Sequence, residues 1–504
     1  MKVRVVFLLL LGAACGGRED AGRQGERSTI WHDDADALVL AEPAYTRGLV
    51  ALDAFDLDGA EFNFSQAIRE FPRHAHAFYQ RGLARLAREQ YDAALEDFTR
   101  ALDAEPGYTE PFDDRAWAYF LKGDGGSARL DAATAIRLNP GIVGWHTTVH
   151  RQLDTDDEVL AFLARAERDA FARTKRGNAW VAKRDHEKAL AEYGAALAAD
   201  PGFVLPWVAR AQLRVALGRY REAVEDCAQA IRLEDRLGYA YELRGWALYA
   251  LGRFADAGQD MGKALALGPE SVRLHQRAGF VAFAQGREEE AMRAFTAANR
   301  WDPLQLFALD ETRGVPAAAV AHFQTKTKES PGSAVAFFLL ANARYAAQQN
   351  DGAIANFTKA LDLAPSFALA LVSRAKVWQV KGETSEAFKD FDRAVGLDPG
   401  SARAFNNRGT IHMEADRQRE ALADYEEAMR LAPRMWWAPS NMAEVWNKRK
   451  EYAKAVRLCT VAVHVGRESR PIAANAYRLR AEAYEGLGDP AAAARDRMLQ
   501  NRGP

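Results

Sequence analysis

The sequence predicts an all-α solenoid of helix–turn–helix repeats. Three observations lead to this prediction: alanines recur at steps of 34 residues, prolines follow them at a fixed distance, and glycines fall near the middle of each repeat. A period of this length fits one pair of helices. The 504 residues exceed what one compact core supports. A stack of repeats resolves this, because each repeat packs only on its neighbours.

Alanines define the second helix of each repeat. The first alanine recurs as Ala60, Ala94 and Ala128, and another alanine follows each of them after seven residues. A large apolar residue such as Phe64 or Phe98 usually lies between the two. Spacings of four and three residues place all of these side chains on one helical face, which we expect to be buried. The first alanine recurs further at Ala189, Ala223, Ala257, Ala291, Ala353, Ala387, Ala421 and Ala455.

Prolines and glycines indicate where the helices end. A proline lies five residues beyond the second alanine of most repeats, where its ring and its missing N–H stop a helix. These are Pro72, Pro106, Pro140, Pro201, Pro269, Pro303, Pro365, Pro399 and Pro433. Glycines occupy the place where the first helix must give way to the second, since glycine tolerates the left-handed residue that closes a helix. These are Gly123, Gly218, Gly252, Gly286, Gly382 and Gly488.

With these features the chain resembles the tetratricopeptide repeat (TPR) family, which also has a small residue at the eighth position of each repeat. Here that residue is Gly48, Gly82, Gly177, Gly245, Gly279 or Gly409, and it lets the paired helices approach closely. The resemblance covers most of residues 41–504 and implies a right-handed superhelix. Twelve good repeats begin at Ala41, Ala75, Thr109, Ala170, Val204, Gly238, Val272, Ala334, Ala368, Ala402, Trp436 and Ala474.

Two short stretches, 143–169 and 306–333, divide the array into three blocks. Each stretch is too short for a full repeat and keeps only an expected second helix, around Val159 to Arg168 and around Ala317 to Thr327. We expect three repeats in residues 41–142, four in 170–305 and five in 334–504. Because a missing helix removes part of the interface between neighbours, we interpret the two stretches as hinges.

The seventh position departs from the family pattern, because arginine replaces the usual leucine in nine of the twelve repeats. Eight of the nine carry an acid sixteen residues later: Arg81 and Asp97, Arg115 and Asp131, Arg176 and Glu192, Arg210 and Asp226, Arg244 and Asp260, Arg374 and Asp390, Arg408 and Asp424, Arg480 and Asp496. Arg47 faces Asn63 instead, and the repeats with Ala278, Leu340 or Met442 lack the acid. We predict an ion pair within each repeat, since a partly buried guanidinium needs a counter-charge. The alternative is a row of ligand-binding arginines.

The N-terminus predicts export. Lys2 and Arg4 precede an apolar run over residues 5–11, which is too short to span a bilayer. Residues 1–14 therefore read as a signal peptide, and no later segment is long and apolar enough to be a membrane span. Leu11 to Cys15 is similar to a bacterial lipobox, although Gly12 stands where a branched residue is usual, so we expect lipidation of Cys15 and a flexible tether over residues 15–40. Simple signal-peptidase cleavage near Ala14 is the alternative.

Other chemistry finds little support in the sequence. Cys227 and Cys459 lie many repeats apart, so we expect two buried thiols and no disulfide. No phosphate-binding loop, nucleophile elbow or metalloprotease signature is present, and we expect neither enzymatic activity nor a cofactor. His146 and His150, followed by three aspartates, are the best metal candidates, but they lack a paired ligand motif and fit a surface helix end as well.

Composition excludes one class of partner. There are 67 basic and 69 acidic residues, and the balance provides no basic field of the kind that attracts nucleic acid.

In TPR proteins the inner face, lined by first helices, commonly receives a peptide. The lysine and asparagine clamp of chaperone-binding members is not reproduced, since the corresponding positions are Thr174, Asn178, Val208 and Gln212.

The positions of that inner face are rich in aromatic residues. They are Tyr79, Trp117, Phe120, Tyr239, Trp246, Tyr249, Phe280, Phe283, Phe338 and Tyr345. Aromatic side chains offer contact area at low entropic cost, so we expect them to line a ligand groove. The alternative for each residue is that it packs between neighbouring repeats.

We interpret the chain as a non-enzymatic scaffold that binds protein or peptide segments. It is expected in the bacterial cell envelope, facing the periplasm or the surface, with membrane contact through the lipid anchor only. The alternative is a carbohydrate or cell-wall binding component of a polysaccharide-export or envelope-assembly machine. Aromatic grooves also stack sugars, and envelope TPR lipoproteins resemble parts of such machines.

Overall fold

The computed structural model describes residues 43–52, 56–139, 160, 163, 166, 169–268, 271–299, 316–432, 437–466 and 470–500. These residues form helices and short turns, and they include no strand. The all-α class is therefore confirmed. The chain divides into two compact units, an N-terminal unit up to residue 270 and a C-terminal unit over Ser271–Gln500. The predicted blocks and their boundaries stay predictions.

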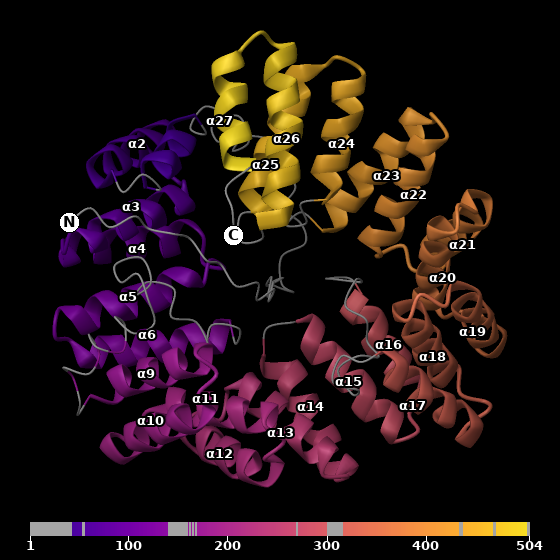
Figure 1. The fold of residues 1–504 in the computed structure, drawn as a ribbon, viewed down its shortest axis with the longest axis horizontal. Helices are drawn as coiled ribbons and strands as arrows, with labels where there is room; N and C mark the ends of the chain where they lie inside the picture. The colour runs from indigo at the N-terminus through magenta and orange to yellow at the C-terminus, as the bar shows by residue number, and fades with distance from the viewer. Residues whose placement is uncertain are drawn as a thin grey trace. The chain divides into compact units, whose positions relative to one another are not determined.

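In the N-terminal unit, consecutive helices form pairs joined by short turns (Figure 1). The pairs are residues 43–52 with α2 (Leu57–Glu70), α3 (Ala75–Ala87) with α4 (Tyr91–Ala104), α5 (Glu110–Leu121) with α6 (Gly125–Leu138), α9 (Ala170–Ala182) with α10 (His186–Ala199), α11 (Val204–Ala216) with α12 (Tyr220–Leu233), and α13 (Gly238–Ala250) with α14 (Phe254–Leu267). Helices α3, α9, α11 and α13 begin at the residue that the period predicts, and α5 begins one residue later.

Among its described residues, the C-terminal unit repeats this arrangement, with α17 between two helix pairs. Its elements are α15 (Val272–Ala284) with α16 (Glu288–Asn299), α17 (Pro316–Glu329), α18 (Ala334–Ala346) with α19 (Asn350–Leu363), α20 (Ala368–Val380) with α21 (Thr384–Leu397), α22 (Ala402–Glu414) with α23 (Gln418–Leu431), α24 (Trp437–Lys448) with α25 (Tyr452–Gly466), and α26 (Arg470–Gly486) with α27 (Pro490–Gln500). Helix α17 covers the helix expected around Ala317 to Thr327, whereas residues 306–315 lie outside the described residues. The helix expected over 159–168 lies mostly outside the described residues.

Prolines and glycines end the helices as predicted. Helix α2 ends at Glu70 and α4 ends at Ala104, each two residues before a proline. All six predicted turn glycines have positive φ, between 72° and 88°. Five other repeats place a non-glycine residue in this left-handed conformation: Glu89, Arg184, Gln348, Asp416 and Lys450. Such residues lose about 1–2 kcal/mol each to the clash of Cβ with the backbone. The turn of the first repeat lies outside the described residues.

The eighth-position glycines allow the two helices of a repeat to touch. A Cβ added to Gly82 would lie 2.7 Å from Cε1 of Phe98, and one added to Gly279 would lie 2.6 Å from the same atom of Phe295. Both rings are fully buried, as are the alanines on either side of them. The repeated alanine–aromatic–alanine pattern thus forms the core, which in the N-terminal unit runs as one cluster from Ala75 to Leu243.

Candidate functional site

The predicted arginine–acid pairs are present in all eight repeats. In seven of them Nε and Nη2 donate to the two carboxylate oxygens, at 2.9 and 2.6 Å in Arg81–Asp97, 2.7 and 2.9 Å in Arg115–Asp131, 3.0 and 2.7 Å in Arg210–Asp226, 2.7 and 2.7 Å in Arg244–Asp260 and in Arg374–Asp390, 2.9 and 2.7 Å in Arg408–Asp424, and 2.8 and 2.8 Å in Arg480–Asp496. In the eighth, Arg176 Nη2 donates to Glu192. Arg47, the predicted exception, donates to Asn63 at 3.1 Å.

These pairs are partly or fully buried. The Arg81 side chain is 15% exposed and Asp97 is 1% exposed, whereas Arg480 and Asp496 are 1% and 2% exposed. Burial raises the pKa of Asp97, and the hydrogen bond and positive charge of Arg81 oppose that rise. The hydrogen bond to Asp260 raises the pKa of Arg244. Two guanidinium nitrogens are thus occupied within the repeat, which supports the structural role over a row of ligand-binding arginines.

In five repeats the arginine also reaches the preceding repeat. Its third nitrogen, Nη1, donates to a side chain on the preceding second helix, a bond that we call the guanidinium staple. The acceptors are Ser65 for Arg81 (3.0 Å), Thr99 for Arg115 (2.9 Å), Thr358 for Arg374 (2.9 Å), Asp392 for Arg408 (2.8 Å) and Thr460 for Arg480 (3.1 Å). Sequence reasoning missed these acceptors, although four of them lie sixteen residues before the arginine.

Five of the ten predicted groove residues are buried in the core. They are Tyr79, Trp117, Tyr239, Phe280 and Phe338, each at most 8% exposed. Tyr79 lies 5.1 Å from Tyr108, which precedes the next first helix, and it donates a hydrogen bond to Asp114. Phe338 lies 4.8 Å from Phe367 at the equivalent place. For these five residues the groove prediction is wrong, because their rings pack within and between repeats.

The other five groove residues are partly exposed. In the N-terminal unit these are Phe120 of α5 and Trp246 and Tyr249 of α13. The Trp246 and Tyr249 rings stack, with centroids 5.0 Å apart and planes 16° from parallel. In the C-terminal unit they are Phe283 of α15 and Tyr345 of α18. Their role as a ligand-binding surface stays a prediction.

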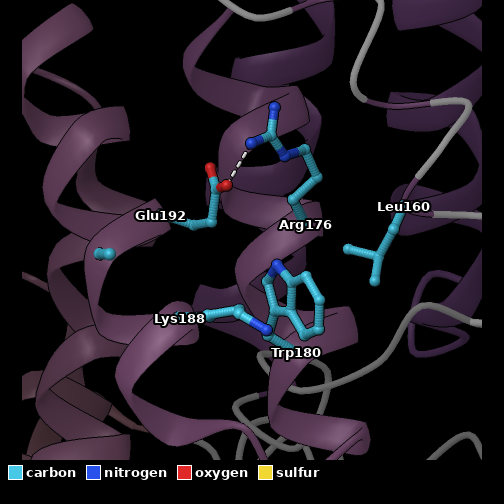
Figure 2. A pocket seen from close by; sticks show the side chains of 6 residues that line it. Leu160, Arg176, Trp180, Lys188 and Glu192 are labelled. Atoms are coloured by element: carbon cyan, nitrogen blue, oxygen red, sulfur yellow. Dashed lines mark hydrogen bonds and ion pairs between the residues drawn. The ribbon is translucent and has the colours of Figure 1, made fainter. Parts of the chain in front are cut away.

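Sequence reasoning also missed a hollow between α9 and α10 of about 280 Å³. It is lined by Leu160, Arg176, Trp180, Lys188, Ala191 and Glu192 (Figure 2). Lys188 Nζ lies 4.3 Å from the Trp180 ring centroid, within cation–π distance. The sequence feature that could have indicated this hollow is Trp180 at the eleventh position of its repeat, where other repeats have Arg85 or Arg214. Arg176 pairs with Glu192 and Lys188 with Asp185, so the cations that line this hollow already have acidic partners.

A buried ion pair joins α5, which precedes the first short stretch, to α9, which follows it. Lys175 Nζ of α9 donates to Asp113 of α5 at 2.6 Å, and the two side chains are 4% and 6% exposed. A hinge at 143–169 would have to move without separating these two charges. The hinge interpretation stays a prediction for both stretches.

The remaining predicted residues divide into buried and undescribed ones. Cys227 and Cys459 are free and buried, and burial raises the pKa of both thiols, to about 12 for Cys459. Cys15, His146 and His150 lie outside the described residues. Within the described residues, no cluster of three or more metal-ligating side chains occurs. No described helix combines the length and apolar character that crossing a bilayer requires.

The C-terminal unit also contains a buried histidine beside an arginine–acid pair. His412 Nε2 lies 3.7 Å from Asp424, and its ring meets Phe388 edge-on at 5.3 Å. Burial and the charge of Arg417 lower the pKa of His412.

Comparison with known proteins places the chain among repeat proteins. Two sequence models described as tetratricopeptide repeat match residues 45–109, 208–272, 243–303 and 338–402, and residues 402–435. A search of curated proteins found no match. The chain is similar to three solved structures. MamA is 22% identical over 32% of this chain and 92% of that chain, with a TM-score of 0.29. Yeast Tom70 is 15% identical over 90% of this chain and 98% of that chain, with a TM-score of 0.33, and the APC/C hetero-tetramer Cut9–Hcn1 is 16% identical over 85% of this chain and 87% of that chain, with a TM-score of 0.36.

All three TM-scores are below 0.5, so the family assignment depends on the sequence matches and on the observed helix pairs. The matched segments together cover just over half of the chain. The helix pairs, the buried alanine pattern and the close-contact glycines occur in both units. The chain therefore belongs to the tetratricopeptide repeat family, and it is a protein–protein interaction scaffold.

Proposed function

We propose that the chain is a non-enzymatic scaffold that binds a protein segment through partly exposed aromatic residues on its first helices. The observation that carries the proposal is the stacked pair of Trp246 and Tyr249 on α13. Both rings are partly exposed, and the Tyr249 ring centroid lies 5.6 Å from that of Phe254, which is also exposed. Aromatic anchors that keep part of their surface accessible are typical of protein interfaces.

We further propose that the scaffold is exported and anchored in the bacterial cell envelope through a lipid on Cys15. The sequence of residues 1–15 supports this proposal, as described above. Incorporation of an alkyne-labelled fatty acid into the full chain tests it. We expect labelling of the wild type and loss of the label in Cys15→Ser, and equal labelling of both would contradict the anchor.

Binding is tested by crosslinking and purification from the envelope fraction, followed by mass spectrometry. The variant is Trp246→Ala with Tyr249→Ala, and the control is Phe62→Ala, which removes a 63% exposed ring from the second helix α2. We expect proteins that are captured by the wild type and the control and lost from the double variant. An unchanged list of proteins would contradict the proposal, and glycan captured in place of protein would favour the carbohydrate-binding alternative.

A further inference from the structure

The guanidinium staple joins neighbouring repeats in one part of the N-terminal unit and is missing from the next part. Arg81 and Arg115 each reach a hydroxyl of the preceding repeat, so helices α2 to α6 are linked by two consecutive staples. In the three repeats that follow, the residue sixteen positions before the arginine has no polar side chain. These three pairs are Leu160 before Arg176, Gly194 before Arg210, and Ala228 before Arg244.

At the joint between α10 and α11, the difference from a stapled joint is one missing acceptor opposite Arg210 Nη1. A Cβ built on Gly194 would lie 3.8 Å from Arg210 Nη1, which is ordinary van der Waals contact, so position 194 faces the nitrogen that forms the staple elsewhere. Arg210 keeps both bonds to Asp226 within its own repeat. Only the side chain that would accept the third bond is missing.

An exposed ion pair crosses the stapled joint α4/α5, and another crosses the unstapled joint α10/α11. Lys122 pairs with Asp92 across the stapled joint between α4 and α5. Arg219 pairs with Glu187 at 2.5 Å across the unstapled joint between α10 and α11. Both pairs are largely exposed, and exposed pairs contribute little to stability. Two less exposed polar contacts therefore distinguish the joint α4/α5 from α10/α11: the partly buried staple from Arg115 to Thr99, and the buried hydrogen bond that Tyr79 of α3 donates to Asp114 of α5. Substitution of Thr99 removes the first and leaves the second in place.

We propose that the unstapled joints α10/α11 and α12/α13 are the compliant joints of the N-terminal unit, where neighbouring repeats separate first. In a solenoid, local stability depends on each repeat and on the interfaces with its nearest neighbours. A partly buried hydrogen bond from a charged group strengthens one interface, and glycine or alanine provides no replacement for it. The array is thus built with stiff and yielding joints, independently of which ligand it binds.

Hydrogen exchange of the full-length protein, measured by mass spectrometry, tests this proposal. In the wild type we expect faster exchange in α10 to α13 than in α2 to α6. The substitution Thr99→Val keeps the shape of the side chain and removes the acceptor of Arg115, and we expect it to speed exchange in α4 and α5 about five- to tenfold. The distant α11 and α12 serve as the internal reference.

The reverse test adds a staple. In Gly194→Thr the new hydroxyl can donate to the carbonyl four residues earlier, as Thr99 does to Leu95 at 2.8 Å, and accept from Arg210. Gly194→Val is the matched control, because it has the same shape and backbone preference without the hydroxyl. We expect exchange in α10 and α11 to be about five- to tenfold slower in Gly194→Thr than in Gly194→Val.

Two results overturn the proposal: unchanged exchange in Thr99→Val, or equal exchange in Gly194→Thr and Gly194→Val. If substitution at position 194 disturbs the fold, as circular dichroism would show, Thr99→Val and a second removal, Ser65→Ala, decide the question. Ser65→Ala is expected to speed exchange in α2 and α3.

Discussion

Breaking the buried pair of Arg480 and Asp496 is expected to destabilise the last repeat strongly. Both side chains are at most 2% exposed, and Arg480 donates to both carboxylate oxygens at 2.8 Å. Replacing Arg480 by methionine leaves a buried carboxylate without its arginine, and replacing Asp496 by leucine leaves a buried guanidinium without its counter-charge. Removal of one partner of a buried pair costs about 3–5 kcal/mol, and we expect each single variant to fall in this range.

The double variant is expected to recover most of this loss. The neighbouring repeat carries Met442 and Leu458 at the same two positions, so Arg480→Met with Asp496→Leu copies a solution that the chain already uses. Replacement of a whole buried ion pair by apolar residues is often close to neutral. We expect the double variant to lie within about 1–2 kcal/mol of the wild type, since no unpaired charge remains.

The assay is hydrogen exchange of α26 and α27 in the full-length protein, because a repeat array does not unfold in one step. Exchange rates convert to local free energies of unfolding, and the four variants complete a double-mutant cycle. The prediction requires a large favourable coupling between the two positions. If the double variant is destabilised by the sum of the two single variants, the pair is not coupled and the reasoning is refuted.

Four further predictions concern single residues. Gln348→Gly is expected to raise the local free energy of unfolding of α18 and α19 by up to about 1 kcal/mol, measured by hydrogen exchange, because Gln348 has a φ of 60°; a loss would contradict the strain argument. Gly82→Ala is expected to lower the local free energy of unfolding of α3 and α4 by about 1–3 kcal/mol in the same measurement, because the new methyl group meets the buried Phe98 ring; no change would show that the helices can move apart. The pKa of His412 is lowered from its ordinary value of 6.5, so the unfolded chain binds a proton before the folded chain does as pH falls. The free energy of unfolding should therefore decrease below about pH 6.5 in the wild type and less so in His412→Phe, and identical pH profiles would refute this. Cys459, with its pKa raised to about 12, should resist thiol reagents until the protein is denatured, and rapid native labelling would contradict its burial.

The parts of the fold that depend on contacts within one repeat could be predicted from the sequence. The pairing of Arg81 with Asp97 follows from a fixed spacing of sixteen residues in a helix pair of constant geometry. The fit of Gly82 against Phe98 follows for the same reason. Each of these contacts recurs in other repeats, so the sequence contains several independent copies of the evidence.

Contacts between repeats were harder to predict. Tyr79 and Phe338 occupy positions expected to face a groove, but the large residue just before the next first helix covers part of each ring. That residue is Tyr108 or Phe367, and both are buried. The acceptors of the guanidinium staple were missed because they lie in the preceding repeat. Their spacing is fixed too, so a search across neighbouring repeats would have found Thr99 and Thr358.

The central functional claim is that a protein segment binds beside the stacked rings of α13. The most direct measurement places a photo-crosslinking amino acid at position 249 in cells and, as the control, at position 62 on α2. The account predicts protein adducts from position 249, identified by mass spectrometry, and none of the same proteins from position 62. No protein adduct from position 249, or the same adducts from both positions, would contradict the claim.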